Sequence, residues 1–174
     1  VENPATEARK HVEAGRFDQA KELYQKGLER SPRDWRLIAE IAEFVIRQAS
    51  DYRAGLELAR AAITINPWYS AWLWNVLGDA LFAMGRYDEA FEAYVQARRI
   101  DSKDPRTSLN LAYSYAQAGA YADALNAIAS GLATDVQGFW RDRLIEKQQL
   151  ILAAISSKWS SEQEWLNRRN VRLR

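Results

Sequence analysis

The chain of 174 residues contains no cysteine and a single histidine, His11. Without cysteine it cannot form a disulfide bond, use a thiolate nucleophile or build a cysteine-ligated zinc site. A single imidazole likewise excludes metal sites that need several histidines. Lysine and arginine number 24 against 23 aspartates and glutamates, so the formal charge is only +1. This near-neutral balance provides no global field that would attract nucleic acid or an anionic membrane.

Long apolar runs are also missing. No stretch of about 18 apolar residues occurs, so the sequence predicts no membrane-spanning helix, and the first ten residues lack the apolar core of a signal peptide. The only methionine is Met84, and we expect the chain to be a fragment of a longer polypeptide or a processed product. The composition is that of a soluble folded protein. We expect a cytoplasmic location, with the periplasm as the alternative.

A short turn motif recurs along the chain. Residues 15–20, 85–90 and 119–124 each combine a glycine, an aromatic residue two positions later and an alanine three positions after that; residues 50–55 are a degraded copy that begins with serine. Successive copies start 35, 35 and 34 residues apart. Glycine can end a helix in the left-handed conformation, and the small alanine lets two helices approach closely. The repeat therefore predicts a series of helix–turn–helix units.

The segments on both sides of each motif have helical periodicity. Before the third motif, Trp74, Leu77, Gly78 and Leu81 recur at helical spacing, and Gly78 is expected at a close helix contact. The second unit is one residue longer than its neighbours, and we place the extra residue in its internal turn. Prolines, which cannot continue a helix, close the first three units: Pro32, Pro67 and Pro105.

The third unit resembles the tetratricopeptide repeat (TPR), whose pattern is W-x2-L-G-x2-Y, then A-x3-F, then P over 34 residues. Trp74, Leu77, Gly78, Ala90 and Tyr94 carry the match, and the resemblance extends over about residues 1–138. It implies an all-α solenoid of helical hairpins that winds into a right-handed superhelix and ends in C-terminal capping helices. Four hairpins are expected, at about residues 1–34, 35–69, 71–104 and 105–138.

The last segment, residues 139–174, departs from the repeat. Residues 139–155 predict an amphipathic helix that caps the solenoid. Ser161 and Glu164 fit a capping box, which predicts a second, short and basic helix at the C-terminus. Its arginines would form either a polyanion-binding patch or a solvated helix end that opposes the helix dipole. We favour the solvated helix end, because the patch is short.

No constellation of residues indicates catalysis. His11 falls where the repeat pattern has a large residue facing the partner helix, so we expect a core or half-buried side chain and no general base. The glycines are not gathered into a phosphate-binding loop, and residues 101–104 lack the central glycine and the glutamate of a calcium loop. We therefore expect no enzyme activity, no metal and no cofactor.

The resemblance implies a binding surface on the concave side, which the first helix of each hairpin lines in this family. TPR proteins of known role bind peptides or extended segments there. Trp72 lies two residues before Trp74 and so points about 200° away from the core stripe. The family's contact positions, with the 139–155 helix continuing the series, give ten candidate partner-binding residues: Arg36, Glu43, Trp72, Asn75, Asp79, Phe82, Arg106, Tyr113, Gln117 and Arg143.

One ligand class of the family can be tested against the sequence. Chaperone-binding members hold a C-terminal carboxylate with lysine, asparagine and arginine at fixed positions of three repeats. Counting from the third repeat, the lysine is missing and Asp79 replaces the first asparagine; counting from the first, the positions are Ala5, Arg9 and Glu40. Both sets are incomplete, so we do not expect a carboxylate clamp.

The sequence therefore favours a non-catalytic scaffold or adaptor that binds a protein or peptide segment in the concave groove. The first alternative is a self-assembling module, with Trp159, Trp165 and the apolar first helix as contact surfaces that would give a homo-oligomer. The second is a regulatory or substrate-recruiting domain of a larger enzyme, such as a glycosyltransferase or methyltransferase. Neither nucleic acid nor a membrane is expected as a partner.

Overall fold

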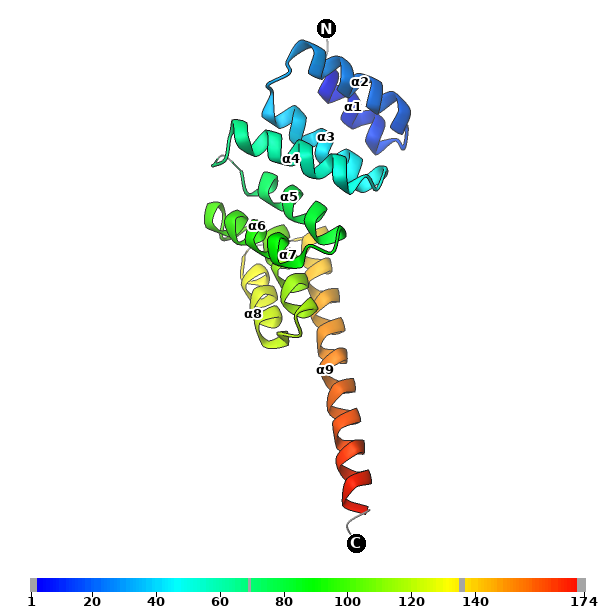
Figure 1. Cartoon of the computed structure of the whole chain (residues 1–174), viewed down its shortest axis with the longest axis vertical. Helices are drawn as coiled ribbons and strands as arrows, with labels where there is room; N and C mark the ends of the chain where they lie inside the picture. Colours follow the sequence, from blue (N-terminus) through cyan, green and yellow to red (C-terminus); the bar gives the residue numbers. More distant parts are fainter. Residues whose placement is uncertain (1–2, 69, 135–136, 172–174) are drawn as a thin grey trace. The chain divides into compact units, whose positions relative to one another are not determined.

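The computed structural model describes residues 3–68, 70–134 and 137–171, with side chains described up to residue 158. Within these ranges all regular structure is helical, which confirms the predicted all-α class (Figure 1). No helix among the described residues is long and apolar enough to cross a membrane. In chain order the helices are α1 (Pro4–Glu13), α2 (Phe17–Arg30), α3 (Trp35–Gln48), α4 (Tyr52–Ile65), α5 (Ala71–Ala83), α6 (Tyr87–Ile100), α7 (Pro105–Gln117), α8 (Tyr121–Leu132) and α9 (Phe139–Val171).

The first eight helices pack mainly in consecutive pairs, α1 with α2, α3 with α4, α5 with α6 and α7 with α8. Three residues separate the helices of each pair. The turn glycines Gly15, Gly85 and Gly119 have φ values of 70°, 74° and 74°, the left-handed conformation that the motif predicts. After Gly85, the amide of Arg86 donates to the carbonyl of Leu81 at 2.9 Å and so closes the end of α5.

The turn of the second pair differs from the other three. Ser50 takes the place of glycine and adopts the same left-handed region, with φ 53°. The extra residue that the sequence analysis places in this turn lies instead in the helix, since α3 has 14 residues and both α5 and α7 have 13. A helix absorbs an added residue by forming one more backbone hydrogen bond between residues four apart.

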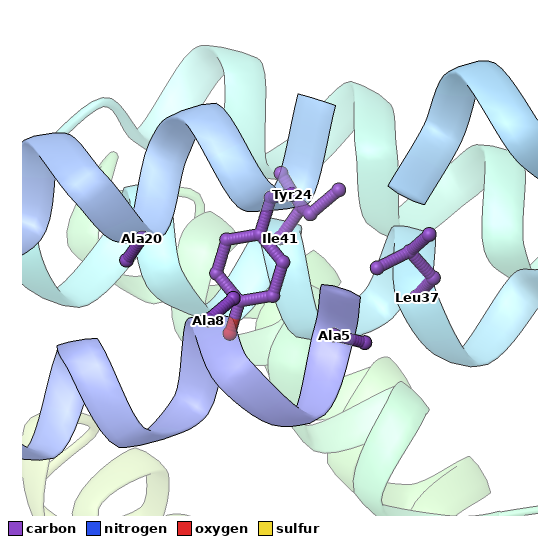
Figure 2. Packing of buried hydrophobic residues seen from close by; sticks show 6 residues of the cluster. All are labelled: Ala5, Ala8, Ala20, Tyr24, Leu37 and Ile41. Atoms are coloured by element: carbon purple, nitrogen blue, oxygen red, sulfur yellow. The ribbon is translucent and has the colours of Figure 1, made fainter. Parts of the chain in front are cut away.

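The chain divides into two compact units, residues 1–102 with α1 to α6 and residues 103–174 with α7 to α9. In the first unit, buried side chains connect one pair of helices to the next. One cluster draws on α1, α2 and α3 (Figure 2): Ala5, Ala8, Ala20, Tyr24, Leu37 and Ile41. Another draws on α3, α4 and α5: Ile38, Ala39, Ala62 and Leu73.

In the second unit, α9 packs against α7 and α8 and buries Leu144 and Ile151. One continuous helix replaces the two C-terminal helices that the sequence analysis predicts, so Ser161 and Glu164 lie within α9. The physical reason is that residues 139–171 contain neither proline nor glycine, so nothing in the sequence terminates the helix. The side chains of the predicted basic patch and of Trp159 and Trp165 lie outside the described residues.

The contact between α5 and α6 generates a stability prediction. Gly78 is buried, and a Cβ atom at this position would collide with the ring of Tyr94, whose hydroxyl donates to Asp79 Oδ1 at 3.0 Å. We expect Gly78→Ala to lower the free energy of unfolding by about 1–3 kcal/mol, measured by urea denaturation. Gly27→Ala is the control, because its Cβ would meet only the flexible end of Leu37, at 3.0 Å. Equal losses for the two variants would contradict the close contact at Gly78.

The turn at Ser50 generates a second prediction. An L-residue in the left-handed region is strained, whereas glycine adopts this conformation freely. We expect Ser50→Gly to raise the free energy of unfolding by about 0.5–1 kcal/mol in the same assay. Ala49→Gly is the neighbouring control, because Ala49 has φ −97° and glycine there only adds flexibility to the unfolded chain. A Ser50→Gly variant no more stable than the wild type would show that the turn stores no strain.

Candidate functional site

The first unit contains a groove with a volume of about 400 Å³, formed by α1, α2, α3 and α5. Its polar lining consists of Arg9, Glu13, Glu40, Glu43, Arg47 and Gln48. Its apolar lining consists of Val12, Tyr24, Phe44 and Trp72. Glu43 and Trp72 are two of the ten candidate residues from the sequence, and the structure brings them into contact here.

Helix α3 supplies most of this lining. Glu40, Glu43, Phe44 and Arg47 are three or four residues apart, so they lie along one face of the helix. The adjoining face carries Leu37, Ile38 and Ile41, among other buried residues. The apolar pattern that buries one side of α3 thus turns a row of charged side chains and one aromatic ring towards the groove.

Trp72 reaches from α5 back to α3. Its indole Nε1 donates a hydrogen bond of 2.8 Å to Glu43 Oε2. The other oxygen of that carboxylate lies 3.5 Å from Nη1 of Arg47, one helical turn further along α3. Both oxygens of Glu43 are therefore engaged, and the ring of Trp72 is fixed as a half-buried wall of the groove.

Glu40 forms the second charged contact, between α3 and α1. Its Oε2 lies 3.3 Å from Nε of Arg9, in an ion pair whose geometry is not that of a hydrogen bond. Burial raises the pKa of the Glu40 carboxyl, although the charge of Arg9 acts in the opposite direction. Loss of hydration therefore outweighs the attraction of Arg9 at this carboxylate.

Tyr24 contributes an uncharged ring to the groove. Burial raises its pKa to about 12, and the negative charge of Glu40 adds to the rise. The ring centroid of Tyr24 lies 5.5 Å from that of Phe44, which in turn lies 6.2 Å from that of Phe17. The phenol therefore stays protonated in neutral solution and packs in a row of aromatic rings.

Besides Trp72, helix α5 carries three candidate residues, Asn75, Asp79 and Phe82, and none of them lines the groove. Asn75 is 0% exposed, which corrects the expectation that it contacts a partner. The reason is that α5 also buries Leu73, Val76 and Leu77, which lie on different sides of the helix. Asp79 is partly buried and accepts the hydrogen bond from Tyr94 already described, so it links α5 to α6.

The remaining candidates of the first unit are more exposed. Arg36 is exposed at the start of α3, where its guanidinium carbon lies 5.2 Å from the ring centroid of Trp35. Phe82 is partly exposed, and its ring makes an edge contact with Tyr87 at 5.0 Å. Neither residue lines the groove.

The second unit holds the other four candidates. Tyr113 of α7 lies beneath Lys147 of α9, whose Nζ is 3.9 Å from the ring centroid, and burial lowers the pKa of Lys147. Arg106 is partly buried, and Gln117 is exposed. Arg143 is exposed and lies 3.9 Å from the Glu146 carboxylate. Lys147 and Tyr113 thus form a cation–π contact within this unit.

Several groove residues were not among the candidates from the sequence. From the sequence, Arg9 and Glu40 were considered only as carboxylate-clamp positions, and Tyr24 was not selected as a contact residue. The sequence could have identified Glu40, because it lies one helical turn before the candidate residue Glu43 and therefore on the same face of α3. Arg9 lies in the first helical hairpin, in which the sequence analysis names no contact residue.

Other chemistry in the described part of the chain is limited. His11 is half-buried, as the sequence predicts, and its Nδ1 accepts a hydrogen bond of 2.9 Å from Nε of Arg16. Among the described residues, no group of three or more histidine, cysteine, aspartate or glutamate side chains is placed to hold a metal ion.

Comparison with known families identifies the repeat. A tetratricopeptide repeat model matches residues 6–67, and a second model, described as a TPR repeat, matches residues 78–119. Together the two models cover more than half of the chain. No curated protein sequence matches it significantly.

Solved structures share the fold. A thermophilic TPR protein of Thermus thermophilus has a TM-score of 0.76 at 21% identity, over 86% of this chain and 81% of that one. A chain of the APC/C Cut9–Hcn1 hetero-tetramer has 0.74 at 19% identity, over 86% and 29%. The first TPR of Spaghetti (RPAP3), bound to the HSP90 peptide SRMEEVD, has 0.62 at 21% identity, over 67% and 90%. At these identities the likeness concerns the fold alone.

The raised pKa of Tyr24 generates a prediction for alkaline solution. An unfolded tyrosine releases its proton near pH 10, whereas Tyr24 in the folded state retains it up to about pH 12. The folded state therefore binds more protons in this window, and the free energy of unfolding falls as the pH rises through it. We expect a smaller fall in Tyr24→Phe, measured by urea denaturation at pH 9, 10 and 11. Tyr87→Phe, at an exposed ring, is the control, and equal slopes for Tyr24→Phe and wild type would contradict the assignment.

Proposed function

Because the chain belongs to the tetratricopeptide repeat family, we propose that it is a non-catalytic adaptor whose first unit binds an extended segment of a partner protein in its groove. TPR repeats generally mediate protein–protein interactions. The observation that carries the proposal is the groove itself, in which Trp72, Phe44 and Tyr24 alternate with charged side chains from α1 and α3. Aromatic rings next to charged groups are typical of the residues that dominate binding energy at protein interfaces.

Two further observations support this proposal. The first TPR of Spaghetti (RPAP3), which shares the fold, is bound to a peptide. Four polar residues of the groove, Arg9, Glu40, Glu43 and Arg47, make contacts that hold side chains in place, and none of these contacts pairs a nucleophile with a base. The only histidine, His11, is held by Arg16. The groove is therefore suited to recognition rather than to chemistry.

Selection from a phage-displayed library of random peptides tests the proposal. The selected peptides, made synthetically, are measured against the wild type and Glu13→Lys/Gln48→Lys, which changes two exposed groove residues. The control is Glu22→Lys/Gln25→Lys, an identical change of charge at exposed positions of α2 that do not line the groove. We expect the groove variant to bind about 10-fold more weakly and the control to bind like the wild type.

Two outcomes would contradict the proposal. Either the library yields no peptide that binds the wild type, or the selected peptides bind the groove variant, the control and the wild type equally. Circular dichroism and thermal unfolding of both double variants show that they are folded, which is expected because all four positions are exposed.

A further inference from the structure

Resting on the proposed function, we infer that the groove of the first unit takes an arginine or lysine side chain from a basic segment of the partner. The groove places its carboxylates deep between aromatic walls and its own arginines at the rim. This arrangement specifies the charge of the ligand, a property that family membership leaves open.

The depth of the charged groups is the first argument. The side chains of Glu40 and Glu43 are each 21% exposed, whereas those of Arg9 and Arg47, which pair with them, are 55% and 65% exposed. With Glu13 included, the lining has three acids and two bases, a net negative charge. Ion pairs with a well-exposed partner contribute little to stability, so an incoming cation can displace Arg9 or Arg47 into solvent at low cost.

The state of Glu40 is the second argument. Its Oε2 is buried and accepts no hydrogen bond, and Arg9 approaches it only as an ion-pair partner. A buried acceptor without a hydrogen bond is unfavourable, and burial, which disfavours the charged form, also raises the pKa of the Glu40 carboxyl. A guanidinium group, with five N–H donors, or an ammonium group, with three, supplies the missing donor.

The walls of the groove are the third argument. Phe44 and Val12 line the groove on the α3 and α1 sides, and Trp72 is held in place by its bond to Glu43. Arginine and lysine bury their methylene stems against apolar surface while the charged head reaches a polar group. Arginine also stacks on aromatic faces, so the lining matches both parts of such a side chain.

The same lining disfavours an acidic ligand. A carboxylate entering the groove would approach Glu40 and Glu43, and juxtaposed like charges reduce affinity. A groove that binds a C-terminal carboxylate in the manner of the chaperone-binding members would need an asparagine at the position of Glu40. The groove therefore selects a basic segment and rejects an acidic C-terminus.

The test uses three defined probes with the full chain. They are the peptide acetyl-Gly-Gly-Arg-Gly-Gly-amide, the same peptide with neutral citrulline in place of arginine, and the acidic peptide acetyl-Gly-Gly-Glu-Gly-Gly, which has a free C-terminal carboxylate and no basic side chain. The readout is the ¹H–¹⁵N resonance of the Trp72 indole, assigned by its disappearance in Trp72→Phe. We expect the arginine peptide to shift this resonance and to bind about 10-fold more tightly than the citrulline peptide. The acidic peptide should produce no shift.

Variants of Glu40 and Arg9, which form an ion pair in the groove, test whether the Glu40 carboxylate binds the arginine of the peptide. Glu40→Gln removes the charge at constant shape and should weaken binding of the arginine peptide about 5–10-fold, whereas Glu57→Gln, at an exposed acid of α4 outside the groove, should not change it. Arg9→Ala removes the internal competitor and should tighten binding about 2–5-fold. A purely structural ion pair would not produce this gain. Arg47→Ala provides an independent version of the same measurement.

The outcomes separate this inference from the proposed function. Equal affinities for the arginine and citrulline peptides, or tighter binding of the acidic peptide, would overturn the inference. The proposed function would still stand if library-selected peptides bind in the groove. If those peptides bind the groove variant Glu13→Lys/Gln48→Lys as tightly as the wild type, both the inference and the proposed function are contradicted. A preference for arginine that Glu40→Gln abolishes and Arg9→Ala strengthens supports both.

Discussion

The close approach of paired helices is the constraint on which the rest of this structure depends. At the contact between α5 and α6, Gly78 leaves just enough room for the ring of Tyr94, and between α3 and α4 a Cβ atom on Gly55 would collide with Ile46. The buried alanines Ala20 and Ala90 have the same effect in their pairs. Small residues at these points let the helices pack at short distance, and each pair becomes a rigid building unit.

Packing between pairs then determines what the groove contains. Core clusters join α1, α2 and α3, and again α3, α4 and α5, so the faces of α1, α3 and α5 that remain outside these clusters come together on one side of the first unit. Trp72 consequently meets Glu43, which is 29 residues earlier in the chain. Arg9 meets Glu40 in the same way. The charges lie at different depths because the longer arginine side chains extend to the rim, where they are 55% and 65% exposed, whereas the shorter glutamate side chains are 21% exposed.

Much of the fold could be predicted because the decisive signals are local. The turn glycines Gly15, Gly85 and Gly119 adopt the left-handed conformation that their spacing predicts, and the helical periodicity around them confirms the all-α class. Two local predictions were wrong for physical reasons. The extra residue of the second pair lengthens α3 rather than its turn, and α9 continues through a predicted break because no residue in it terminates a helix.

The sequence by itself determined the repeat, the helices and the small residues at the close contacts, because these depend on interactions between residues that are near in the chain. The tertiary structure decided the groove. Asn75 is at a family contact position yet is fully buried, while Arg9, Glu40 and Tyr24 line the groove without having been selected. Exposure and charge pairing depend on which side chains from other helices cover a residue, and that follows from packing over long sequence separations rather than from any local pattern.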